Sequence, residues 1–374
     1  MPRPLSKRFC RLPAALLIVL FFSTATTAAP LLPASGAQAD QSSVSGISSG
    51  GFMATQFHVA YSARLVGAGI VAGGPYFCAG SDTPANALSS QPYLSTATTT
   101  CMNPCRWAFW PFIEWCEQAM LPDGKELAAR AQQFAEEGKI DPLEQLSRDR
   151  LYLFSGGEDD TVVRAVVDQA LAFYRAVGIA DTAILFDQVA SAQHAFIATS
   201  ASNRCDYHGS PYINRCGDYD QARTLLQRLY GALEPNNPDP RGELLTFDQR
   251  EFVATADFER SGLADQGYLY RPQSCSSEPC RVHVALHGCQ QSAEEFATNK
   301  VYFHQLAGYN EVADNNRIIV LYPQIRARSA MQQSPYNPRG CWDFWGYSGS
   351  DFYTKTGVQM QAIAQMIDRL MQPR

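Results

Sequence analysis

Short apolar runs alternate along the chain with longer stretches in which apolar residues recur every three or four positions. The runs end in turn residues and predict buried strands at 152–154, 183–186, 282–286 and 318–322. The periodic stretches predict helices at 126–136, 162–176, 219–233, 293–313 and 358–370. This alternation is typical of a mostly parallel central sheet flanked by helices, so we expect an α/β fold.

The N-terminus has the pattern of an export signal. Basic residues precede a short apolar stretch at 12–22, and small residues follow it. We predict a signal peptide over residues 1–39, cleaved after Ala37-Gln38-Ala39, with cleavage near Ala28 as the alternative. A membrane anchor is less well supported, because hydroxyl residues follow the short apolar run at once. We therefore expect a secreted protein, extracellular or periplasmic, that does not contact a membrane after cleavage.

Composition limits the partners more than it identifies them. Of 374 residues, 46% are hydrophobic, which is enough for a large core, and no linker divides residues 40–374. We expect a single domain and a monomer. The net charge of -6 argues against nucleic acid and against anionic membrane as main partners.

Ten cysteines follow Cys10, and an even number in an exported protein suggests disulfides. Local spacing suggests Cys205–Cys216 and Cys275–Cys280. Four further cysteines lie close together and allow three pairings, of which we predict Cys78–Cys101 and Cys105–Cys116. Cys101 and Cys105 loosely resemble half of a zinc site. No Cys/His pair at matching spacing completes that site, so we expect no metal.

The segment Gly46-Ile47-Ser48-Ser49-Gly50 matches G-x-S-x-G. Apolar residues lead into it, and 52–57 has the pattern of a helix. A strand, a sharp turn and a helix in this order lift a serine hydroxyl into the open, where it can act as a nucleophile. We predict this role for Ser48 and a backbone N–H donor at Ser49. A plain Gly- and Ser-rich turn is the alternative.

A serine nucleophile needs a base and a carboxylate that orients the base. Asp159 and Asp160 follow the predicted strand at 152–154, and either could be the acid. His194 follows the strand at 183–186. The order Ser, Asp, His is that of α/β-hydrolases, so we predict His194 as the base.

One motif stands out of its usual order. His287-Gly288-Cys289 ends the strand at 282–286, and such turns supply an oxyanion-hole N–H in α/β-hydrolases. That turn normally precedes the nucleophile in the chain, whereas here it follows His194. The order indicates a circular permutation.

Several segments occur together in one known family: 45–54, 72–76, 283–289, 319–324, 340–343 and 357–360. By these segments, which cover nearly all of the mature chain in family order, the sequence resembles the circularly permuted poly(3-hydroxybutyrate) depolymerases. These are secreted single-domain enzymes with an α/β-hydrolase fold. The resemblance implies Ser48 as nucleophile and His194 as base. Its Ser/Thr-Gly-x-x-Asp pattern selects Asp159 over Asp160.

The resemblance also implies the surroundings of the nucleophile. The backbone N–H groups of Ser49 and Cys289 would form the oxyanion hole, and a Cys289–Cys341 disulfide would hold the latter in place. The family reads Cys-Trp-Asp-Trp where this chain has Phe at the last position, followed by another Trp. We expect aromatic side chains of this loop to bind substrate: Trp342, Phe344 and Trp345.

An insertion around 78–149 is longer than the family suggests and carries Trp107, Trp110, Phe112 and Trp115. These aromatics could pack an extra subdomain or contact an apolar polyester. The expected activity is hydrolysis of poly(3-hydroxybutyrate) or its oligomers through an acyl-enzyme, without a cofactor. A feruloyl or acetyl esterase is the alternative, since related hydrolases carry the same HGC motif. A non-catalytic binding protein is a third possibility.

Overall fold

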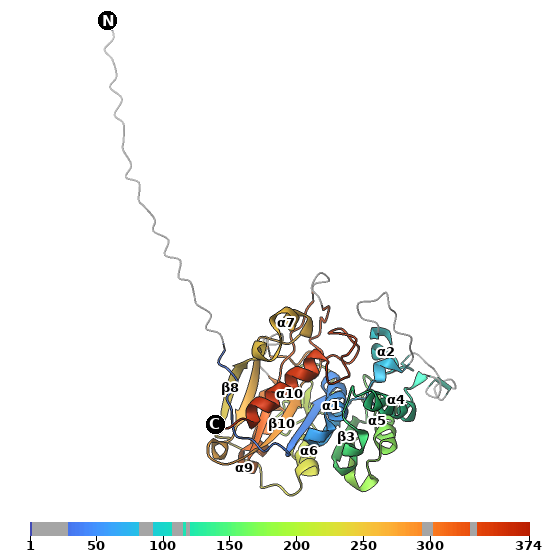
Figure 1. The fold of residues 1–374 in the computed structure, drawn as a ribbon, viewed down its shortest axis with the longest axis horizontal. Helices are drawn as coiled ribbons and strands as arrows, with labels where there is room; N and C mark the ends of the chain where they lie inside the picture. Colours follow the sequence, from blue (N-terminus) through green and yellow to red (C-terminus); the bar gives the residue numbers. More distant parts are fainter. Residues whose placement is uncertain (2–28, 82–92, 107–114, 117–119, 294–301, 330–334) are drawn as a thin grey trace.

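The computed structural model describes residues 1, 29–81, 93–106, 115–116, 120–293, 302–329 and 335–374. In this part of the chain an eight-stranded sheet has the order β4-β3-β2-β1-β10-β11-β9-β8 (Figure 1). Its strands are β1 (Ser42–Ile47), β2 (Leu65–Val71), β3 (Arg150–Gly156), β4 (Ile184–Val189), β8 (Glu243–Asp248), β9 (Gln266–Arg271), β10 (Arg281–Leu286) and β11 (Ile318–Tyr322). The six strands from β4 to β11 in this order run parallel to one another. β9 pairs antiparallel with both of its neighbours, β11 and β8. The expected α/β fold with a mostly parallel sheet is confirmed.

Helices cover this sheet, and Figure 1 shows α10 crossing its near face. The helices are α1 (Ser49–Ala60), α2 (Leu94–Thr98), α4 (Gly124–Glu136), α5 (Arg164–Ala176), α6 (Gln221–Tyr230), α7 (Thr255–Ser261), α8 (Phe303–Leu306), α9 (Tyr309–Asn316) and α10 (Val358–Met371). Short 3-10 turns lie at Ser62–Arg64, Cys78–Gly80, Leu143–Arg148, Asp181–Ala183, Gln249–Phe252 and Gln273–Ser276. A small second sheet pairs β5 (Phe196–Ile197) and β6 (Asn203–Arg204) with β7 (Ile213–Arg215).

The central strands are buried on both faces. Every residue of β1 and β11 is buried, and so are the last five of β10. Strands in such a position read as continuous apolar runs, which is why β10 and β11 could be predicted. β8 forms the edge of the sheet and is largely exposed, so its sequence carries no such signal.

The helices predicted at 126–136, 162–176, 219–233 and 358–370 correspond to α4, α5, α6 and α10. The single helix predicted at 293–313 is wrong. α8 ends at Leu306, and Gly308, with a φ of 81°, separates it from α9. A left-handed backbone cannot continue a right-handed helix. Residues 294–301 lie outside the described residues.

The two halves of the sheet come from the two halves of the chain. β1 to β4 form one half, β8 to β11 form the other, and β1 pairs with β10 between them. If the second half is placed first, the strand order becomes 1-2-4-3-5-6-7-8. In that numbering β10 becomes strand 3 and precedes β1, which becomes strand 5. This is the strand order that the expected circular permutation predicts; the permutation itself stays a prediction.

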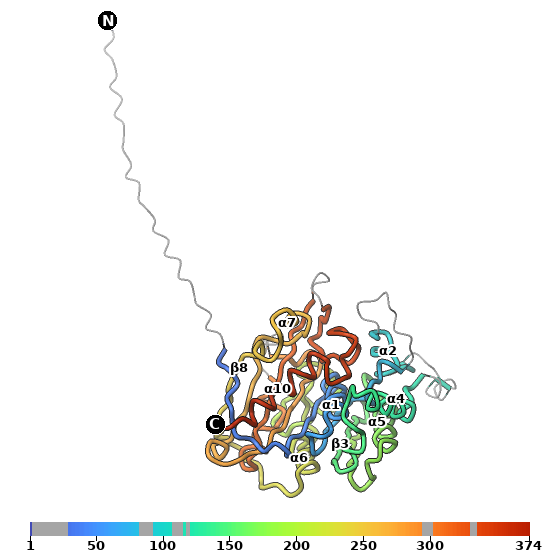
Figure 2. Tube along the Cα trace, in the orientation of Figure 1, coloured from blue at the N-terminus to red at the C-terminus, as the bar shows by residue number. Residues whose placement is uncertain are grey.

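The start of the described chain packs against its end, as Figure 2 shows for the blue and red segments. The N–H groups of Ser35 and Ala37 donate to the carbonyl oxygen of Leu370, at 3.2 and 2.9 Å. Leu32 is 1% exposed. Residues 30–38 are thus part of the folded body, although they fall within the predicted signal peptide. Most of that peptide, 2–28, lies outside the described residues.

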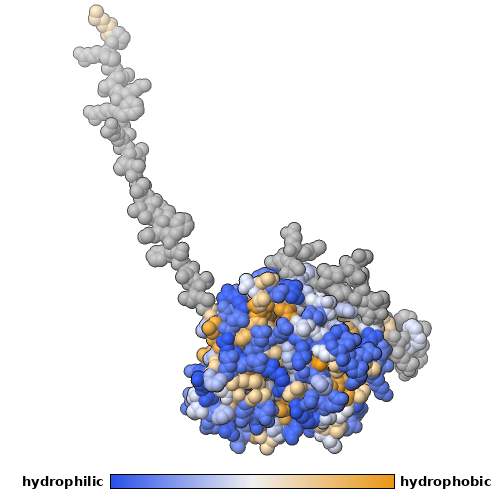
Figure 3. All heavy atoms as spheres, in the orientation of Figure 1, coloured by the Kyte–Doolittle hydropathy of each residue, from blue (hydrophilic) through white to orange (hydrophobic). Residues whose placement is uncertain are grey.

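Five disulfides are formed, and they are the five predicted pairs: Cys78–Cys101, Cys105–Cys116, Cys205–Cys216, Cys275–Cys280 and Cys289–Cys341. The first two hold the insertion that follows β2. Of the aromatic residues noted there, Trp115 is 68% exposed, whereas Trp107, Trp110 and Phe112 lie outside the described residues. On the face shown in Figure 3, apolar residues are scattered in small groups among polar ones.

Candidate active site

Ser48 occupies a strained turn between β1 and α1. Its φ of 57° and ψ of -123° are unusual for a residue other than glycine, and such strain is characteristic of functional sites. Gly46 and Gly50 make the turn possible. A Cβ on Gly46 would lie 2.2 Å from the oxygen of Gly50, and one on Gly50 would lie 2.4 Å from the oxygen of His287. Glycine is therefore required at both ends of the turn.

The helix that follows the turn is buried on every side. All twelve residues of α1 are buried, so the helix presents no polar face to solvent. Inside it, His58 Nε2 forms a hydrogen bond with Asp149 Oδ2 at 2.9 Å, and neither side chain is exposed. Ser49 begins this helix, so its backbone N–H has no acceptor within the helix. The turn and its helix form a rigid support for Ser48.

His194 and Asp159 form a buried pair at the carboxyl edge of the sheet. His194 Nδ1 donates to Asp159 Oδ2 at 2.8 Å, and the side chains are only 8% and 1% exposed. The other oxygen of Asp159, Oδ1, accepts N–H groups from Thr161 and Val162, each at 2.9 Å. Because an ionised carboxylate only accepts hydrogen bonds, the proton of His194 lies on Nδ1.

Asp160 points elsewhere. Its side chain is 54% exposed, and its Oδ1 lies 3.5 Å from His208 Nδ1. Of the two acids that the residues alone left open, Asp159 is the one beside His194. The Nε2 atom of His194 has no hydrogen bond within the described part of the chain. In hydrolases without substrate, the contact between base and nucleophile often tightens only on binding.

The turn after β10 lies directly against Ser48. A Cβ on Gly288 would be 3.3 Å from the Cβ of Ser48. His287 holds this turn as a neutral ring: Nδ1 donates to the oxygen of Gly288 at 2.7 Å, and Nε2 accepts the N–H of Ile325 at 3.2 Å. Burial lowers the pKa of His287 to about 4, which agrees with the neutral form. Cys289 follows, facing the same space as Ser49.

A buried glutamine connects this turn to the loop of His194. Gln291 Oε1 accepts the N–H of Gly288 at 2.6 Å, and its Nε2 donates to the oxygen of Tyr212 at 3.1 Å. That same oxygen accepts the N–H of Phe196, two residues after His194, at 2.9 Å. No sequence motif includes Gln291; only its position beside the HGC motif could have drawn attention to it.

The aromatic loop after Cys341 is shaped by one buried carboxylate. Asp343 Oδ1 accepts the N–H groups of Trp345, Gly346 and Tyr347. Its Oδ2 accepts both the N–H and the hydroxyl of Ser348. These hydrogen bonds wrap the backbone of 345–348 around the acid. The loop is joined to the turn after β10 by the Cys289–Cys341 disulfide.

A crevice of about 410 Å³ opens at Ser48. Ser49, Cys289, Phe344 and Trp345 are among the residues that line it. Phe344 stacks on Phe52 with ring centroids 4.4 Å apart.

The prediction that all three aromatic residues of this loop contact substrate is wrong for Trp342. It is fully buried, and its ring lies 5.7 Å from that of His287. It is also absent from the described lining of the crevice. This tryptophan packs beside His287 of the turn after β10 instead.

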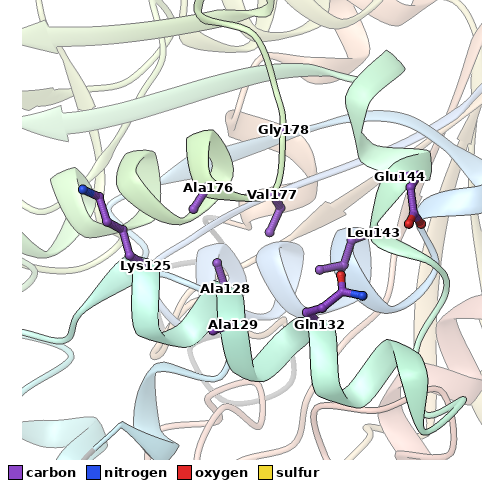
Figure 4. A pocket seen from close by; sticks show the side chains of 9 residues that line it. All are labelled: Lys125, Ala128, Ala129, Gln132, Leu143, Glu144, Ala176, Val177 and Gly178. Atoms are coloured by element: carbon purple, nitrogen blue, oxygen red, sulfur yellow. The ribbon is translucent and has the colours of Figure 1, made fainter.

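A second hollow, of about 470 Å³, lies between α4 and the end of α5 (Figure 4). Its walls are formed by small and aliphatic side chains, with Lys125 and Glu144 at its ends. Its described lining holds no Ser, Cys or His, so it lacks the nucleophile and base of a serine hydrolase. Among the described residues, no cluster of three His, Cys, Asp or Glu side chains could hold a metal ion. None of the helices in the described ranges is long and apolar enough to cross a membrane.

The sheet order and the strained serine turn between strand and helix define a fold of the α/β-hydrolase type. We found no family model that matches the chain. It is 35% identical to a poly(3-hydroxybutyrate) depolymerase of Delftia acidovorans, over 92% of this chain and 62% of that protein. It is 33% identical to a polyhydroxybutyrate depolymerase of Talaromyces funiculosus, over 93% of this chain and 94% of that protein.

Solved structures agree. A PHB depolymerase from Penicillium funiculosum is 32% identical, with a TM-score of 0.75 over 91% of this chain and 98% of the other. A PHB depolymerase variant complexed with an R3HB trimer has the same TM-score at 31% identity, again over 91% and 98%. The chain belongs to the poly(3-hydroxybutyrate) depolymerase family. It spans 62% of the length of the Delftia relative and nearly all of the fungal one.

Proposed function

We propose that the protein is a serine esterase that hydrolyses ester bonds of poly(3-hydroxybutyrate) or its oligomers. The observation that carries this proposal is the buried Asp159–His194 pair, at the same sheet edge as the strained Ser48. Ser48, Asp159 and His194 follow β1, β3 and β4, which are parallel. The carboxyl ends of parallel strands lie at one edge, where α/β proteins place their sites.

In the proposed reaction the oxygen of Ser48 attacks the ester carbonyl while Nε2 of His194 takes its proton. Asp159 stabilises the imidazolium through its hydrogen bond to Nδ1. The backbone N–H groups of Ser49 and Cys289 stabilise the oxyanion. His194 then gives the proton to the leaving alcohol. In the second half of the reaction, water attacks the acyl group while His194 takes a proton from it, and His194 then returns the proton to Ser48.

The shape of the crevice supports a polyester as substrate. A 3-hydroxyacid polyester is uncharged along its length and carries a small side chain on each unit. The crevice offers it apolar and aromatic walls beside the nucleophile, including Phe344 and Trp345. A relative in the same family has been solved with an R3HB trimer.

The test compares ester classes on the purified protein. We expect hydrolysis of 3-hydroxybutyrate trimer and of a suspension of the polymer, with much slower hydrolysis of ethyl ferulate and of acetylated xylan. The Ser48→Ala variant serves as the control for contaminating esterases. Rapid hydrolysis of the feruloyl ester without hydrolysis of the trimer would assign the site to plant polysaccharide esters.

We further propose that the protein is exported and that the leader ends near Ala28, the earlier of the two cleavage sites considered. Cleavage after Ala39 would remove Leu32, which is buried, and the hydrogen bonds between residues 35–37 and the end of α10. N-terminal sequencing of the exported protein tests this directly. A mature chain that begins at Asp40 would refute it.

A further inference from the structure

We propose that Arg339 gives the crevice a binding site for the free carboxylate end of a short hydroxyacid oligomer. Soluble, acid-terminated oligomers would then be preferred over uncharged esters of the same length. This proposal rests on the proposed function, because it concerns which esters the same crevice accepts.

The position of Arg339 is fixed by its backbone. Its carbonyl oxygen accepts the N–H of Gln290 at 2.7 Å, and Gln290 directly follows the oxyanion residue Cys289. Two residues after Arg339, Cys341 is bonded to Cys289. Arg339 is thus attached to the wall that carries an oxyanion donor, and it lines the crevice together with Ser48.

Arg339 also differs in charge from its surroundings. It is the only charged residue in the described lining of the crevice, which is otherwise apolar or neutral. Its guanidinium has no acidic partner in the described ranges. Two arginines of the preceding segment are paired: Arg326 with Asp265 at 2.9 Å, and Arg328 with Glu259. Arg339 is exposed, so water solvates its charge until a ligand binds. An exposed cation without an acidic partner beside apolar walls is suited to an anion brought by the ligand.

The chemistry of the substrate supplies such an anion. An oligomer of 3-hydroxyacids has a hydroxyl at one end and a carboxylate at the other. When Ser48 attacks an ester, the acyl part stays on the serine, and the alcohol part carries the carboxylate end. A guanidinium can hold a carboxylate by two parallel hydrogen bonds, which fixes the orientation of that end. In the polymer interior and in a methyl ester this anion is missing.

The experiment measures kcat/KM for cleavage of the internal ester bonds of 3-hydroxybutyrate trimer and of its methyl ester, in which a methyl group removes the terminal charge. The wild-type protein should prefer the acid. In Arg339→Gln the acid-to-methyl-ester ratio should fall about tenfold, the effect of losing a hydrogen bond to a charged group. Arg339→Lys should restore part of the ratio, since it keeps the charge without the bidentate geometry. The matched control is Arg317→Gln, an arginine with a 61% exposed side chain paired with Glu278, away from the crevice; it should leave the ratio unchanged.

Salt gives a second readout. The preference for the acid should weaken as ionic strength rises in the wild type and should be insensitive to salt in Arg339→Gln. Equal loss on acid and methyl ester in Arg339→Gln, or an unchanged ratio, would overturn the proposal while leaving the proposed function intact. Failure of the wild type to hydrolyse either trimer would refute the proposed function, and this proposal with it.

Discussion

Asp159→Asn provides a sharp test of the site because the exchange keeps the shape of the side chain and changes one hydrogen bond. The asparagine oxygen can still accept the N–H groups of Thr161 and Val162, which Oδ1 accepts at 2.9 Å in the acid. The fold should therefore survive. The amide nitrogen, however, would take the place of Oδ2, 2.8 Å from His194 Nδ1.

An amide nitrogen donates and cannot accept, so Nδ1 of His194 must become the acceptor. Its proton then moves to Nε2, the atom that has to accept the proton of Ser48. The charge that stabilises the imidazolium is lost as well. Triads that lose this acid in the same way fall about 10⁴-fold in kcat, which corresponds to about 5 kcal/mol of transition-state stabilisation.

The assay is kcat for p-nitrophenyl butyrate, with the melting temperature measured alongside to show that the variant is folded. Asp160→Asn is the matched control. The side chain of Asp160 is 54% exposed and lies 3.5 Å from His208, so we expect less than about a threefold change in kcat. The reasoning is refuted if Asp160→Asn is the more damaging exchange, or if folded Asp159→Asn keeps a tenth of the wild-type activity.

Three further outcomes are expected. Ser48→Ala should lower ester hydrolysis at least ~10³-fold with the fold intact; substantial turnover would exclude Ser48 as nucleophile. Phe344→Ala should lower trimer hydrolysis about tenfold more than p-nitrophenyl butyrate hydrolysis, since only the longer substrate needs the stacked wall; an unchanged ratio would make that ring structural. Burial lowers the pKa of His287 to about 4 and of His283 and His304 to about 3. The unfolded chain therefore binds more protons than the folded chain below pH 6.5. The contribution of these neutral histidines to the free energy of unfolding is fully present above pH 6.5 and is lost as the pH falls toward 3. His287 alone should cost about 2 kcal/mol at pH 5, measured by urea unfolding; equal free energies of unfolding at pH 5 and 7.5 would contradict this.

The parts of the fold that could be predicted are those in which burial alone determines the sequence. β11 is apolar at every position because both of its faces are covered. β2 contains Gly67 and Gly69, and the former is required because its φ is 151° and a Cβ there would lie 2.0 Å from the backbone oxygen of Arg150 in β3. The reason for that glycine is a neighbour far away in the chain, so the strand signal is weakened by a contact that the sequence does not reveal.

The residues of the site also divide into those that a local sequence pattern predicts and those that depend on distant contacts. Ser48 could be predicted because its turn is a local structure with a local requirement for glycine. Asp159 and Asp160 could not be distinguished from the residues alone, because two adjacent side chains point in different directions and only the backbone decides which. Gln291 and Arg339 make their contacts where three loops pack together: the turn after β10, the loop of Tyr212 and the loop before Cys341. No local pattern predicts such contacts.

The Cys289–Cys341 disulfide connects one wall of the crevice to one half of the proposed oxyanion hole. Such bonds persist in oxidising compartments and are reduced in the cytosol. In a newly synthesised chain that is still inside the cell, this disulfide would therefore not have formed. The chain would carry the triad residues, but the turn with Cys289 and the crevice wall with Cys341 would not yet be joined. Its capacity to cleave polyester would depend on where the chain is as well as on how it is folded. The same bond that shapes the crevice would restrict activity to places where thiols become oxidised.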